Sequence, residues 1–477
     1  MTDYPDTLLH IDGQWRPAAG GLTLPVLDPS TGQPIGTVAK AGRGDLDDAL
    51  AATSRGFDIW RKTSAFDRSR IMVAAAARLR DLAPGIAANM SREQGKPLAQ
   101  ALAETLAGAD IIDWFAGEAQ RTYGQVIPSR APGTLQMTIM QPVGPVAAFT
   151  PWNFPINQVV RKLSAALAAG CSVIVKGPEE TPASPAGLVQ AFIDAGVPAG
   201  VIGLVYGDPA EISGYLIPHP VIRKVSFTGS TQVGKELAAL AARHMKRVTM
   251  ELGGHAPVIV AADADIAMAS SMMVGSKVRN AGQVCVSPTR FLVQDAVADG
   301  FLERFTEGMA AVRVGRWDEP GVEMGPLANA RRVTALETLI EDAVGRGARL
   351  TTGGRRIGNQ GNFFEPTVLA DVPTDARIMN EEPFGPIAVV NRFDTLDEAL
   401  AEANRLPFGL AAYGFTGAGE TATRMGEEVE SGMISINHLG LALPEVPFGG
   451  LKDSGHGTEG GSEAIKAYMD VRFVTRR

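Results

Sequence analysis

Cys285 is the residue of this chain whose type and surroundings best suit covalent chemistry. It follows the Ala-Gly-Gln turn at 281–283, between a predicted helix and a predicted strand. A lone cysteine is usually a small buried hydrophobe, and Cys171, which leads straight into an apolar strand, fits that structural role. The turn would instead place the Cys285 sulfur at an element boundary, where a thiolate could attack an electrophilic carbon if a base or a positive charge lies nearby.

Two other side chains could support such a nucleophile. Glu251 ends a predicted strand and is followed by Leu252-Gly-Gly, so it is either a solvated carboxylate or a catalytic base that other groups can approach closely. Asn153 lies between a strand and a helix. There it could cap the helix, or its amide could donate to an oxyanion without adding charge.

A third group of residues could hold a nucleotide. Lys176 follows a buried strand, and Glu179, three positions later, could accept hydrogen bonds from a ribose diol. Gly229 and Ser230 open a helix whose first N–H groups could bind phosphate. The spacing Gly-x-x-x-x-Gly at 229–234 is neither the dinucleotide fingerprint nor a P-loop, so it is weak by itself. The six histidines show no metal-ligand spacing, and we expect no metal.

The elements that must position these residues alternate between Pro142 and Glu251. The expected strands are Val143–Phe149, Ser172–Val175, Val201–Val205, Val221–Phe227 and Arg247–Glu251. The expected helices are Pro155–Ala169, Pro182–Ala195, Pro209–Ile217 and Thr231–His244. Such alternation predicts an α/β fold with a doubly wound, mainly parallel sheet, and ligands in such sheets lie beyond the carboxyl ends of the strands.

A second alternation runs from Pro257 to Ile436 and predicts a second α/β domain. Its expected elements include the strands Pro257–Val260 and Thr289–Val293 and the helices Asp265–Lys277 and Leu327–Arg346. The N-terminal region is expected to be largely helical after Asp45, with helices over Leu46–Thr63 and Arg68–Gln94. The β-like stretches Tyr123–Gln141 and Tyr468–Val474 are expected to pair with each other.

Composition excludes several classes of protein. The chain has 477 residues and a net charge of −8, with no Lys/Arg-rich run, so we expect no nucleic-acid partner. No apolar run is long enough to span a membrane, and the N-terminus lacks the features of a signal peptide. Two cysteines cannot build a disulfide framework, which favours a reducing compartment, and we expect a cytoplasmic protein.

Six motifs together resemble the NAD(P)-dependent aldehyde dehydrogenase superfamily over essentially the full length. They are Phe149-Thr-Pro-Trp-Asn-Phe-Pro, Phe227-Thr-Gly-Ser-Thr-Gln-Val-Gly, Met250-Glu-Leu-Gly-Gly, Gly282-Gln-Val-Cys, Glu381-Glu-Pro-Phe-Gly-Pro and Pro447-Phe-Gly-Gly-Leu-Lys-Asp-Ser-Gly. The resemblance implies that Cys285 is the nucleophile, Glu251 the general base and Asn153 the oxyanion donor. It also implies cofactor contacts by Thr150, Pro151, Trp152, Lys176, Glu179, Gly229, Ser230, Leu252, Glu382 and Phe384.

The resemblance further implies the domain organisation. We expect an NAD-binding domain at residues 1–119 and 143–254, a catalytic domain at 255–453, and an oligomerisation arm and tail at 120–142 and 454–477. A homodimer or homotetramer would follow from such an arm. NAD is expected to be preferred over NADP, because the Glu179 carboxylate would bond the ribose 2′-hydroxyl but repel a 2′-phosphate.

The expected substrate is a short ω-carboxylated aldehyde. The expected substrate contacts are Gln158, Arg161, Arg279 and Leu443. Arg161 and Arg279 resemble the carboxylate-binding arginines of succinic semialdehyde dehydrogenases, although most arginines form surface ion pairs. Stretches around Gln158 and Glu179 look closer still to bacterial α-ketoglutaric semialdehyde (2,5-dioxovalerate) dehydrogenases. Ala442 and Leu443 stand where the succinic enzymes carry serines, which makes the pocket more apolar and leaves neutral or aromatic aldehydes as an alternative.

Three rival functions remain open. A CoA-acylating dehydrogenase generally lacks a base such as Glu251. A cysteine hydrolase would leave the cofactor motifs unexplained. A non-catalytic binding protein of the same fold would have no need for Cys285, Glu251 and Asn153 together.

Overall fold

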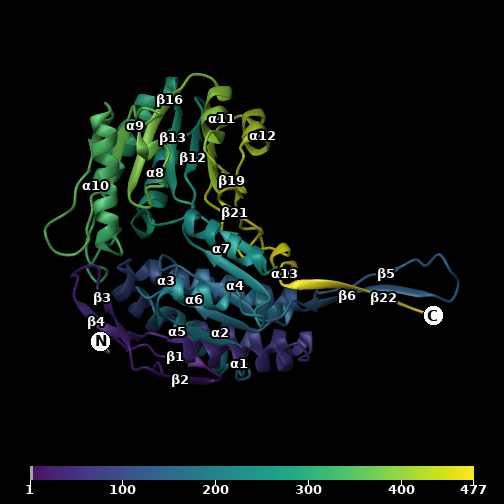
Figure 1. The fold of residues 1–477 in the computed structure, drawn as a ribbon. Helices are drawn as coiled ribbons and strands as arrows, with labels where there is room; N and C mark the ends of the chain where they lie inside the picture. Colours follow the sequence, from purple (N-terminus) through teal and green to yellow (C-terminus); the bar gives the residue numbers. More distant parts are fainter. Residues whose placement is uncertain (1–3) are drawn as a thin grey trace.

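Five parallel strands form the centre of the first sheet, as the alternation of elements predicts. In spatial order they are β9 (Ile202–Val205), β8 (Val173–Lys176), β7 (Val146–Phe149), β10 (Lys224–Thr228) and β11 (Arg247–Glu251). The antiparallel strands β1 (Leu9–Ile11) and β2 (Gln14–Arg16) extend one edge, and β21 (Gly455–His456) pairs with β11 at the other. Figure 1 shows this computed structural model, which describes residues 4–477.

Helices cover both faces of this sheet. They are α1 (Arg43–Trp60), α2 (Ala65–Gln94), α3 (Leu98–Ala119), α4 (Asn157–Ala169), α5 (Ala183–Asp194), α6 (Pro209–Leu216) and α7 (Thr231–Arg243). The expected ends of the helices at Gln94 and Ala169 are confirmed, and the residues that follow, Gly95 and Gly170, adopt left-handed conformations at φ 93° and 99°. Every residue of β7, β8 and β9 is therefore buried, which explains their uninterrupted apolar runs.

One expected strand of this sheet is shorter than predicted. Strand β10 begins at Lys224 and not at Val221, because residues 216–222 form turns closed by main-chain hydrogen bonds from His219 to Leu216 and from Ile222 to His219. The first forty residues, about which the sequence analysis makes no prediction, contain β1 and β2 and the hairpin of β3 (Thr23–Leu27) and β4 (Pro34–Ala39).

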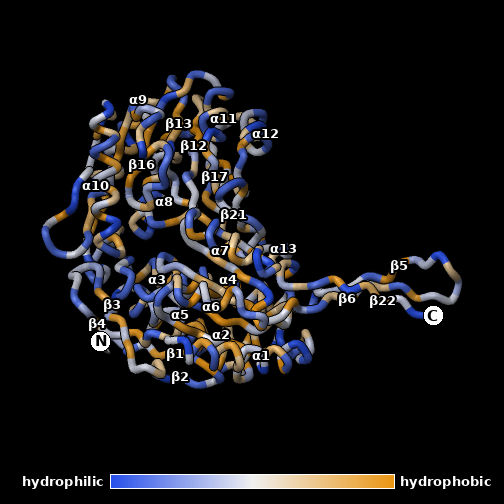
Figure 2. The backbone as a smooth tube through the Cα atoms, in the orientation of Figure 1, coloured by the Kyte–Doolittle hydropathy of each residue, from blue (hydrophilic) through white to orange (hydrophobic). Residues whose placement is uncertain are grey.

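The second sheet has its own core. Its strands are β14 (Arg349–Thr352), β15 (Thr367–Ala370), β16 (Ile387–Phe393), β13 (Pro288–Gln294), β12 (Ala256–Val260), β18 (Ala411–Phe415) and β19 (Met433–Ile436). Strand β14 is antiparallel to β15, and the other neighbours pair in parallel. Its helices are α8 (Ile266–Val278), α9 (Asp295–Ala311), α10 (Ala330–Gly345), α11 (Leu396–Asn404) and α12 (Gly419–Glu428). Figure 2 shows apolar segments concentrated inside both layers.

A long antiparallel ribbon projects away from the two sheets. It consists of β5 (Val126–Ile127), β6 (Leu135–Pro142) and β22 (Met469–Arg476), with Met469 opposite Pro142 and Arg476 opposite Leu135. The expected pairing of the two β-like stretches is confirmed (Figure 1). Within residues 4–477 no helix is long and apolar enough to cross a membrane.

The fold brings strand ends and loops from both sheets to one place. The ends of β7, β10 and β11 face the turns that precede β13 and β16, and α4 and α7 begin at the same edge. The short strands β17 (Phe408–Gly409) and β20 (Leu451–Lys452) and the helix α13 (Glu463–Lys466) complete the connections around it.

Candidate active site

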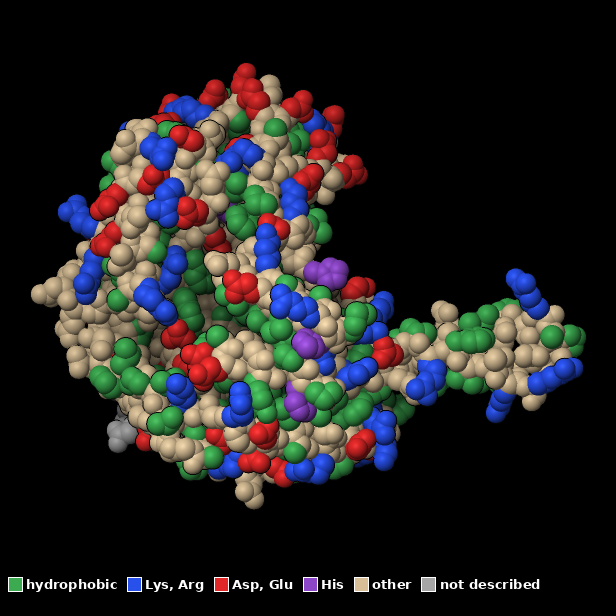
Figure 3. Space-filling model, viewed as in Figure 1, with side chains coloured by type: hydrophobic (Ala, Val, Ile, Leu, Met, Phe, Trp, Pro, Cys, Tyr) green, Lys and Arg blue, Asp and Glu red, His purple; other side chains and the backbone are tan. Residues whose placement is uncertain are grey.

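A pocket of about 460 Å³ lies between the two sheets, a volume typical of small-molecule sites. Figure 3 shows the surface hollowed between the two layers. The predicted site residues that line the pocket are Pro151, Trp152, Asn153, Gln158, Gly229, Ser230, Leu252, Cys285, Glu382 and Phe384. The sequence analysis did not single out five others, which are Thr228, Gly253, Asn329, Arg331 and Arg332.

Cys285 is held by a turn with an unusual backbone. After α8 the chain forms a 3₁₀ turn over Arg279–Gly282 in which Asn280 and Ala281 adopt positive φ values of 50° and 52°. Gly282 is required next, because a Cβ there would lie 2.1 Å from the carbonyl oxygen of Gly385. This close approach of two main chains fixes the half-buried Cys285 at the wall of the pocket.

The Cys285 thiol is not activated by its surroundings alone. Burial, together with the charges of Glu251 and Glu382, raises the pKa of the thiol to about 12, and Arg279 lowers it only in part. The sulfur is therefore a neutral thiol at pH 7, and a base must take its proton before it can act as a nucleophile.

Glu251 is placed to accept a proton. It ends β11, is 2% exposed, and neither carboxylate oxygen has a hydrogen-bond partner among the described residues. Burial and the charge of Glu459 raise the pKa of Glu251 well above its usual value, against the opposing charges of Lys162 and Arg161. A buried carboxyl with a raised pKa is the type of group that can serve as a general base near neutral pH.

The sequence analysis missed the buried ion pair beside Glu251. Lys162 lies on α4 and pairs with Glu459, and its Nζ also donates to Thr228 Oγ1 at 2.6 Å. The signal was weak, because a lysine within an apolar helix is usually exposed, whereas Lys162 is fully buried. The glutamate comes from the C-terminal segment, which was expected to belong only to the arm and tail.

Asn153 points toward the turn that carries the cysteine. It is 2% exposed, and its side-chain Nδ2 donates to the carbonyl oxygen of Gln283 at 3.1 Å. The side-chain amide of Asn153 is thus bonded to the turn just before Cys285. A substrate oxygen atom held at the Cys285 sulfur would therefore lie near an uncharged donor.

The outer part of the pocket suits a flat ring and a phosphate. The rings of Trp152 and Phe384 stand edge to face with centroids 5.7 Å apart, and Phe384 has a positive φ of 43°. Thr231, the first residue of α7, has a buried hydroxyl oxygen without a partner among the described residues. A ligand that bonds this hydroxyl and the free N–H groups of the first turn of α7 would satisfy both.

Glu382 completes this part of the site. Burial raises the pKa of Glu382 to about 7, while a main-chain hydrogen bond from Gly254 lowers it. A Cβ at Gly253 would lie 2.5 Å from its carboxylate, so the glycine makes room for the glutamate.

Three of the predicted cofactor residues lie outside the lining of this pocket. The Nζ of Lys176 lies 2.6 Å from the Glu179 carboxylate, which also accepts the main-chain N–H of Gly207 at 3.0 Å. Thr150 bonds the carbonyl oxygen of Lys176 at 3.3 Å. These residues lie together at the ends of β7 and β8, the edge of the sheet where a nucleotide was expected.

The predicted substrate residues differ in their surroundings. Arg161 is 5% exposed, its Nη2 donates to the carbonyl oxygen of Ala442 at 2.7 Å, and its guanidinium lies 5.0 Å from the Phe448 ring centroid. Its Nη1 is buried and has no partner in the described part of the chain. Arg279 is exposed and lies over the Phe154 ring, and Leu443 is 47% exposed on the loop before Phe448.

No group of His, Cys, Asp and Glu side chains in residues 4–477 has an arrangement that could hold a metal ion. The residues gathered here can perform nucleophilic attack by a cysteine, with a carboxylate base, an amide donor and a buried arginine nearby.

The chain matches known proteins over almost all of its length. The model of the aldehyde dehydrogenase family matches residues 15–474. The chain is 47% identical to 4-(hydroxymethyl)benzenesulfonate dehydrogenase of Comamonas testosteroni, over 98% of this chain and 97% of the relative. It is 42% identical to a glutarate-semialdehyde dehydrogenase of Pseudomonas putida, over 98% and 96%. The crystal structure of an Escherichia coli NADP-dependent enzyme superposes with a TM-score of 0.97 at 39% identity, covering 99% of this chain and 98% of that one.

Proposed function

The chain belongs to the aldehyde dehydrogenase family, and from this premise we propose that it oxidises an aldehyde with an anionic tail to the corresponding acid. A short ω-carboxylated aldehyde, such as α-ketoglutaric or succinic semialdehyde, is the first candidate. The observation that carries the substrate class is Arg161, a buried cation whose Nη1 lacks a partner among the described residues. A substrate anion would satisfy that N–H and offset the cost of burying the charge.

The proposed reaction begins at the sulfur. Glu251 accepts the thiol proton of Cys285, and the thiolate adds to the aldehyde carbon. The carbonyl oxygen becomes an alkoxide that accepts hydrogen bonds from the Asn153 side chain and the Cys285 main-chain N–H. When the alkoxide collapses, the aldehyde hydrogen leaves as hydride and a thioester on Cys285 remains.

Hydrolysis of the thioester requires the base again. Glu251 first releases the thiol proton to solvent, and its carboxylate then takes a proton from a water molecule as the water attacks the thioester carbon. The carbon–sulfur bond then breaks, which releases the acid and returns the thiolate of Cys285. Lys162 and Glu459 adjoin Glu251, so its proton affinity depends on this neighbouring pair.

The residues of the outer pocket fit a nicotinamide dinucleotide, which when bound supplies the hydride acceptor. The orphan hydroxyl of Thr231 and the first turn of α7 would hold the pyrophosphate. Trp152, Phe384 and Glu382 would hold the nicotinamide and its ribose, and Lys176 and Glu179 the adenosine ribose. The cofactor is NAD or NADP, and we propose a preference for NAD.

A panel of aldehydes tests this function. NADH formation, followed by absorbance, should show a higher kcat/KM for carboxylated semialdehydes than for neutral aldehydes of equal length, and added CoA should leave the product as the free acid. A higher kcat/KM for butanal or benzaldehyde would overturn the proposed substrate class. Formation of an acyl-CoA would indicate a CoA-acylating dehydrogenase.

An aromatic aldehyde with a sulfonate group is a second candidate. The Comamonas relative is named for a compound that contains both an aromatic ring and a sulfonate. In this chain the loop over residues 441–443 is apolar, which favours a ring more than a serine-lined loop would. A sulfonate can accept the same hydrogen bonds from Arg161 as a carboxylate, so 4-formylbenzenesulfonate belongs in the panel.

Replacing Glu251 should separate the two halves of the reaction. We expect Glu251→Gln to retain a burst of NADH of stoichiometric amplitude that forms more slowly, because the Cys285 thiol must now lose its proton to solvent. The steady-state rate should fall further, by about 10²–10³-fold, because the thioester still forms but water is no longer activated. In the wild type the raised pKa of Glu251 keeps the carboxyl protonated at low pH, so the steady-state rate should rise with pH as the carboxylate forms. The variant should lack that rise. Rapid-mixing absorbance measures both phases, and an equal loss of burst and turnover would contradict the proposed role in hydrolysis.

The cofactor preference should depend on Glu179. We expect Glu179→Ser to shift the ratio of kcat/KM for NAD over NADP toward NADP by about 10- to 100-fold, because the change removes a negative charge near the expected 2′-phosphate and frees Lys176 to pair with it. The neighbouring Glu180→Ser is the control, since the ion pair of Glu180 is with Arg331, at 3.5 Å. Comparable kcat/KM for both cofactors in the wild type would contradict this role.

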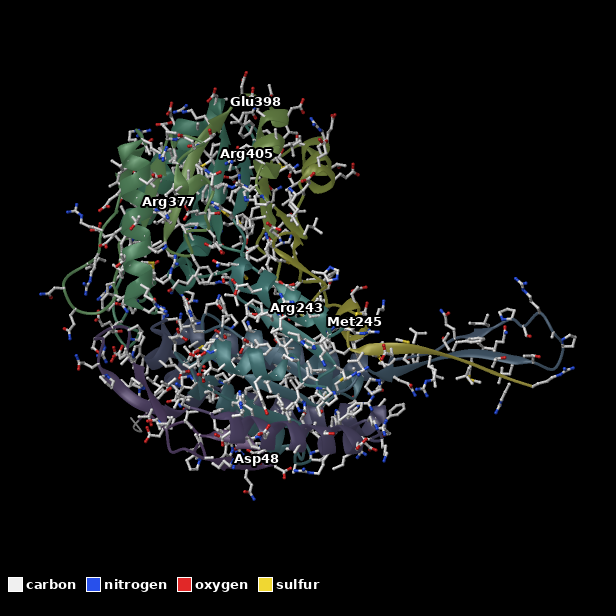
Figure 4. All side chains as sticks on the ribbon, viewed as in Figure 1. Asp48, Arg243, Met245, Arg377, Glu398 and Arg405 are labelled. Carbon is white, nitrogen blue, oxygen red and sulfur yellow. The ribbon has the colours of Figure 1, made fainter. Side chains whose placement is uncertain are left out.

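We also propose that the protein forms a homodimer or homotetramer in the cytoplasm. The projecting ribbon exposes Val126, Val471 and Phe473, by 76%, 65% and 55%, and Figure 3 shows apolar side chains gathered along it. Met245, labelled in Figure 4 at the end of α7, is 91% exposed. Apolar side chains on an open strand edge are usually covered by a partner. Light scattering on the purified protein gives the assembly mass.

The free thiols of Cys171 and Cys285 suit a reducing compartment.

A further inference from the structure

A buried ion pair behind the pocket lies outside the machinery described above. Lys96, in the turn between α2 and α3, places its Nζ 2.6 Å from Oε2 of Glu104 on α3, and the two side chains are 1% and 2% exposed. Burying two opposite charges is costly unless their remaining donors and acceptors are also satisfied. The other bonds of this pair therefore indicate what it holds in place.

Lys96 and Glu104 hold the segment that carries the proposed oxyanion donor. The Nζ of Lys96 also donates to the main-chain carbonyl of Asn153 at 2.9 Å and lies 4.4 Å from the Phe154 ring centroid. The second carboxylate oxygen of Glu104 accepts the main-chain N–H groups of Ile156 at 2.9 Å and of residue 157 at 3.3 Å. The pair thus fixes both ends of the short connection between the Asn153 carbonyl and the start of α4.

The same scaffold is tied to the turn before the nucleophile. Asn280 donates from Nδ2 to the carbonyl of Asn153 at 2.9 Å, and its own Oδ1 accepts from Gln94 at 2.6 Å. Asn280 is one of the two strained residues of this turn, with a φ of 50°. Backbone strain of this kind persists only where neighbouring contacts enforce it. The carbonyl of Asn153 is thus where the end of α2, the turn before Cys285 and the start of α4 meet.

We propose that Lys96, paired with Glu104, is a positioning residue that orients the Asn153 amide toward the oxygen of the reacting carbonyl. This inference rests on the proposed function. Lys96 itself faces the main chain of Asn153 and the Phe154 ring, so it acts through Asn153. Because Lys96 and Asn280 both donate to the carbonyl of Asn153, the peptide plane that contains this carbonyl has little freedom to rotate. The direction in which the Asn153 side chain leaves the main chain is then fixed as well. A displacement of about 1 Å in such a donor can cost on the order of 10²-fold in rate.

The test is a mutant cycle on the rate of NADH formation in a single turnover. The double change Lys96→Met with Glu104→Gln removes both charges, so no unpaired ion is left buried. We expect this rate to fall by about 10- to 100-fold while the KM for NAD stays within about threefold, because the change acts on the transition state and not on cofactor binding. In the Asn153→Ala background the same double change should lower the single-turnover rate by less than about threefold, because the amide that the ion pair positions is absent.

Two outcomes would overturn this inference and leave the proposed function intact. A double variant with the wild-type rate, or an equal loss in both backgrounds, would show that Lys96 does not act through Asn153. A wild-type rate in Asn153→Ala by itself would instead overturn the proposed role of Asn153 and this inference with it. If the double variant does not fold, Lys96→Arg gives the same cycle, because arginine keeps the buried positive charge beside Glu104 but places its donors differently against the Asn153 carbonyl.

A second ion pair, between β2 and α1, controls for a general loss of stability; it is only partly buried, since the Arg16 side chain is 31% exposed and that of Asp45 is fully buried. Arg16 bonds Asp45 at 3.1 Å beside the outer edge of the first sheet, on the side of β2. The double change Arg16→Met with Asp45→Asn should lower the melting temperature without changing the single-turnover rate. A fall in that rate equal to the fall caused by the Lys96 and Glu104 variant would also overturn the inference.

Discussion

Cys285→Ala is expected to abolish aldehyde oxidation, with a loss of at least about 10⁴-fold in kcat, the scale found when a covalent nucleophile is removed. Without the sulfur no thioester can form, and neither Glu251 nor Asn153 provides an alternative acceptor for the aldehyde carbon. Binding of NADH, measured by its fluorescence, should stay within about twofold of the wild type, because Trp152, Thr231 and Glu382 are unchanged.

Cys171→Ala is the matched control for this change. Cys171 is fully buried beneath the arm, where burial raises the pKa of its thiol to about 11, and its Sγ contacts the carbonyl oxygen of Tyr468. The control should therefore reduce thermal stability and leave kcat unchanged. Full activity in Cys285→Ala would mean that hydride leaves a non-covalent adduct such as an aldehyde hydrate, and the proposed mechanism would be wrong.

The parts of the molecule that the sequence predicts are those with local signals. The order of strands and helices from β7 to β11 follows from short apolar runs, amphipathic spacing and glycine stops such as Gly170. Cys285 and Glu251 stand out because each occupies the boundary of an element next to glycines, where a buried strand or helix gives way to an accessible turn.

The rest depends on contacts between distant residues, which have no local signature. Lys162 and Glu459 are separated by 297 positions, and each reads locally as an ordinary charged residue. Lys96 lies 57 residues before Asn153, and only the packing of α3 against α4 brings the two together. The positive φ values of Asn280 and Phe384 likewise result from tertiary packing, since neither residue type requires such a conformation. The short strand β1 forms because it can pair with β9 on one side and β2 on the other, and not because three residues have strong propensity.

Arg161→Leu is expected to change which aldehydes the enzyme accepts. If Arg161 binds the substrate anion, its loss should lower kcat/KM for carboxylated or sulfonated aldehydes by about 30- to several-thousand-fold, mainly through KM, which is the usual cost of truncating one member of a buried, hydrogen-bonded charge pair. Oxidation of butanal should change little when it is assayed at a pH high enough for Glu251 to be ionised in both enzymes, because Cys285, Asn153 and Glu251 remain. At lower pH the loss of the Arg161 charge raises the pKa of Glu251 and should slow both classes of aldehyde alike. Arg279→Leu should have a smaller effect in the same direction, since Arg279 is exposed and water screens its charge.

The contrast between the two classes of aldehyde identifies what Arg161 does. Its guanidinium also donates to the carbonyl of Ala442 and packs on Phe448, so a purely structural role would disturb the loop before Phe448 and reduce oxidation of every aldehyde equally. Arg161→Lys sharpens the distinction, because lysine keeps the charge but not the planar pair of donors. If kcat/KM for the acidic aldehydes is partly restored in Arg161→Lys relative to Arg161→Leu, while kcat/KM for butanal is unchanged, then charge and geometry both contribute to binding the anion. Equal losses for both classes in Arg161→Leu would show that the arginine supports the loop, and the substrate specificity would then lie with the apolar side chains at 441–443.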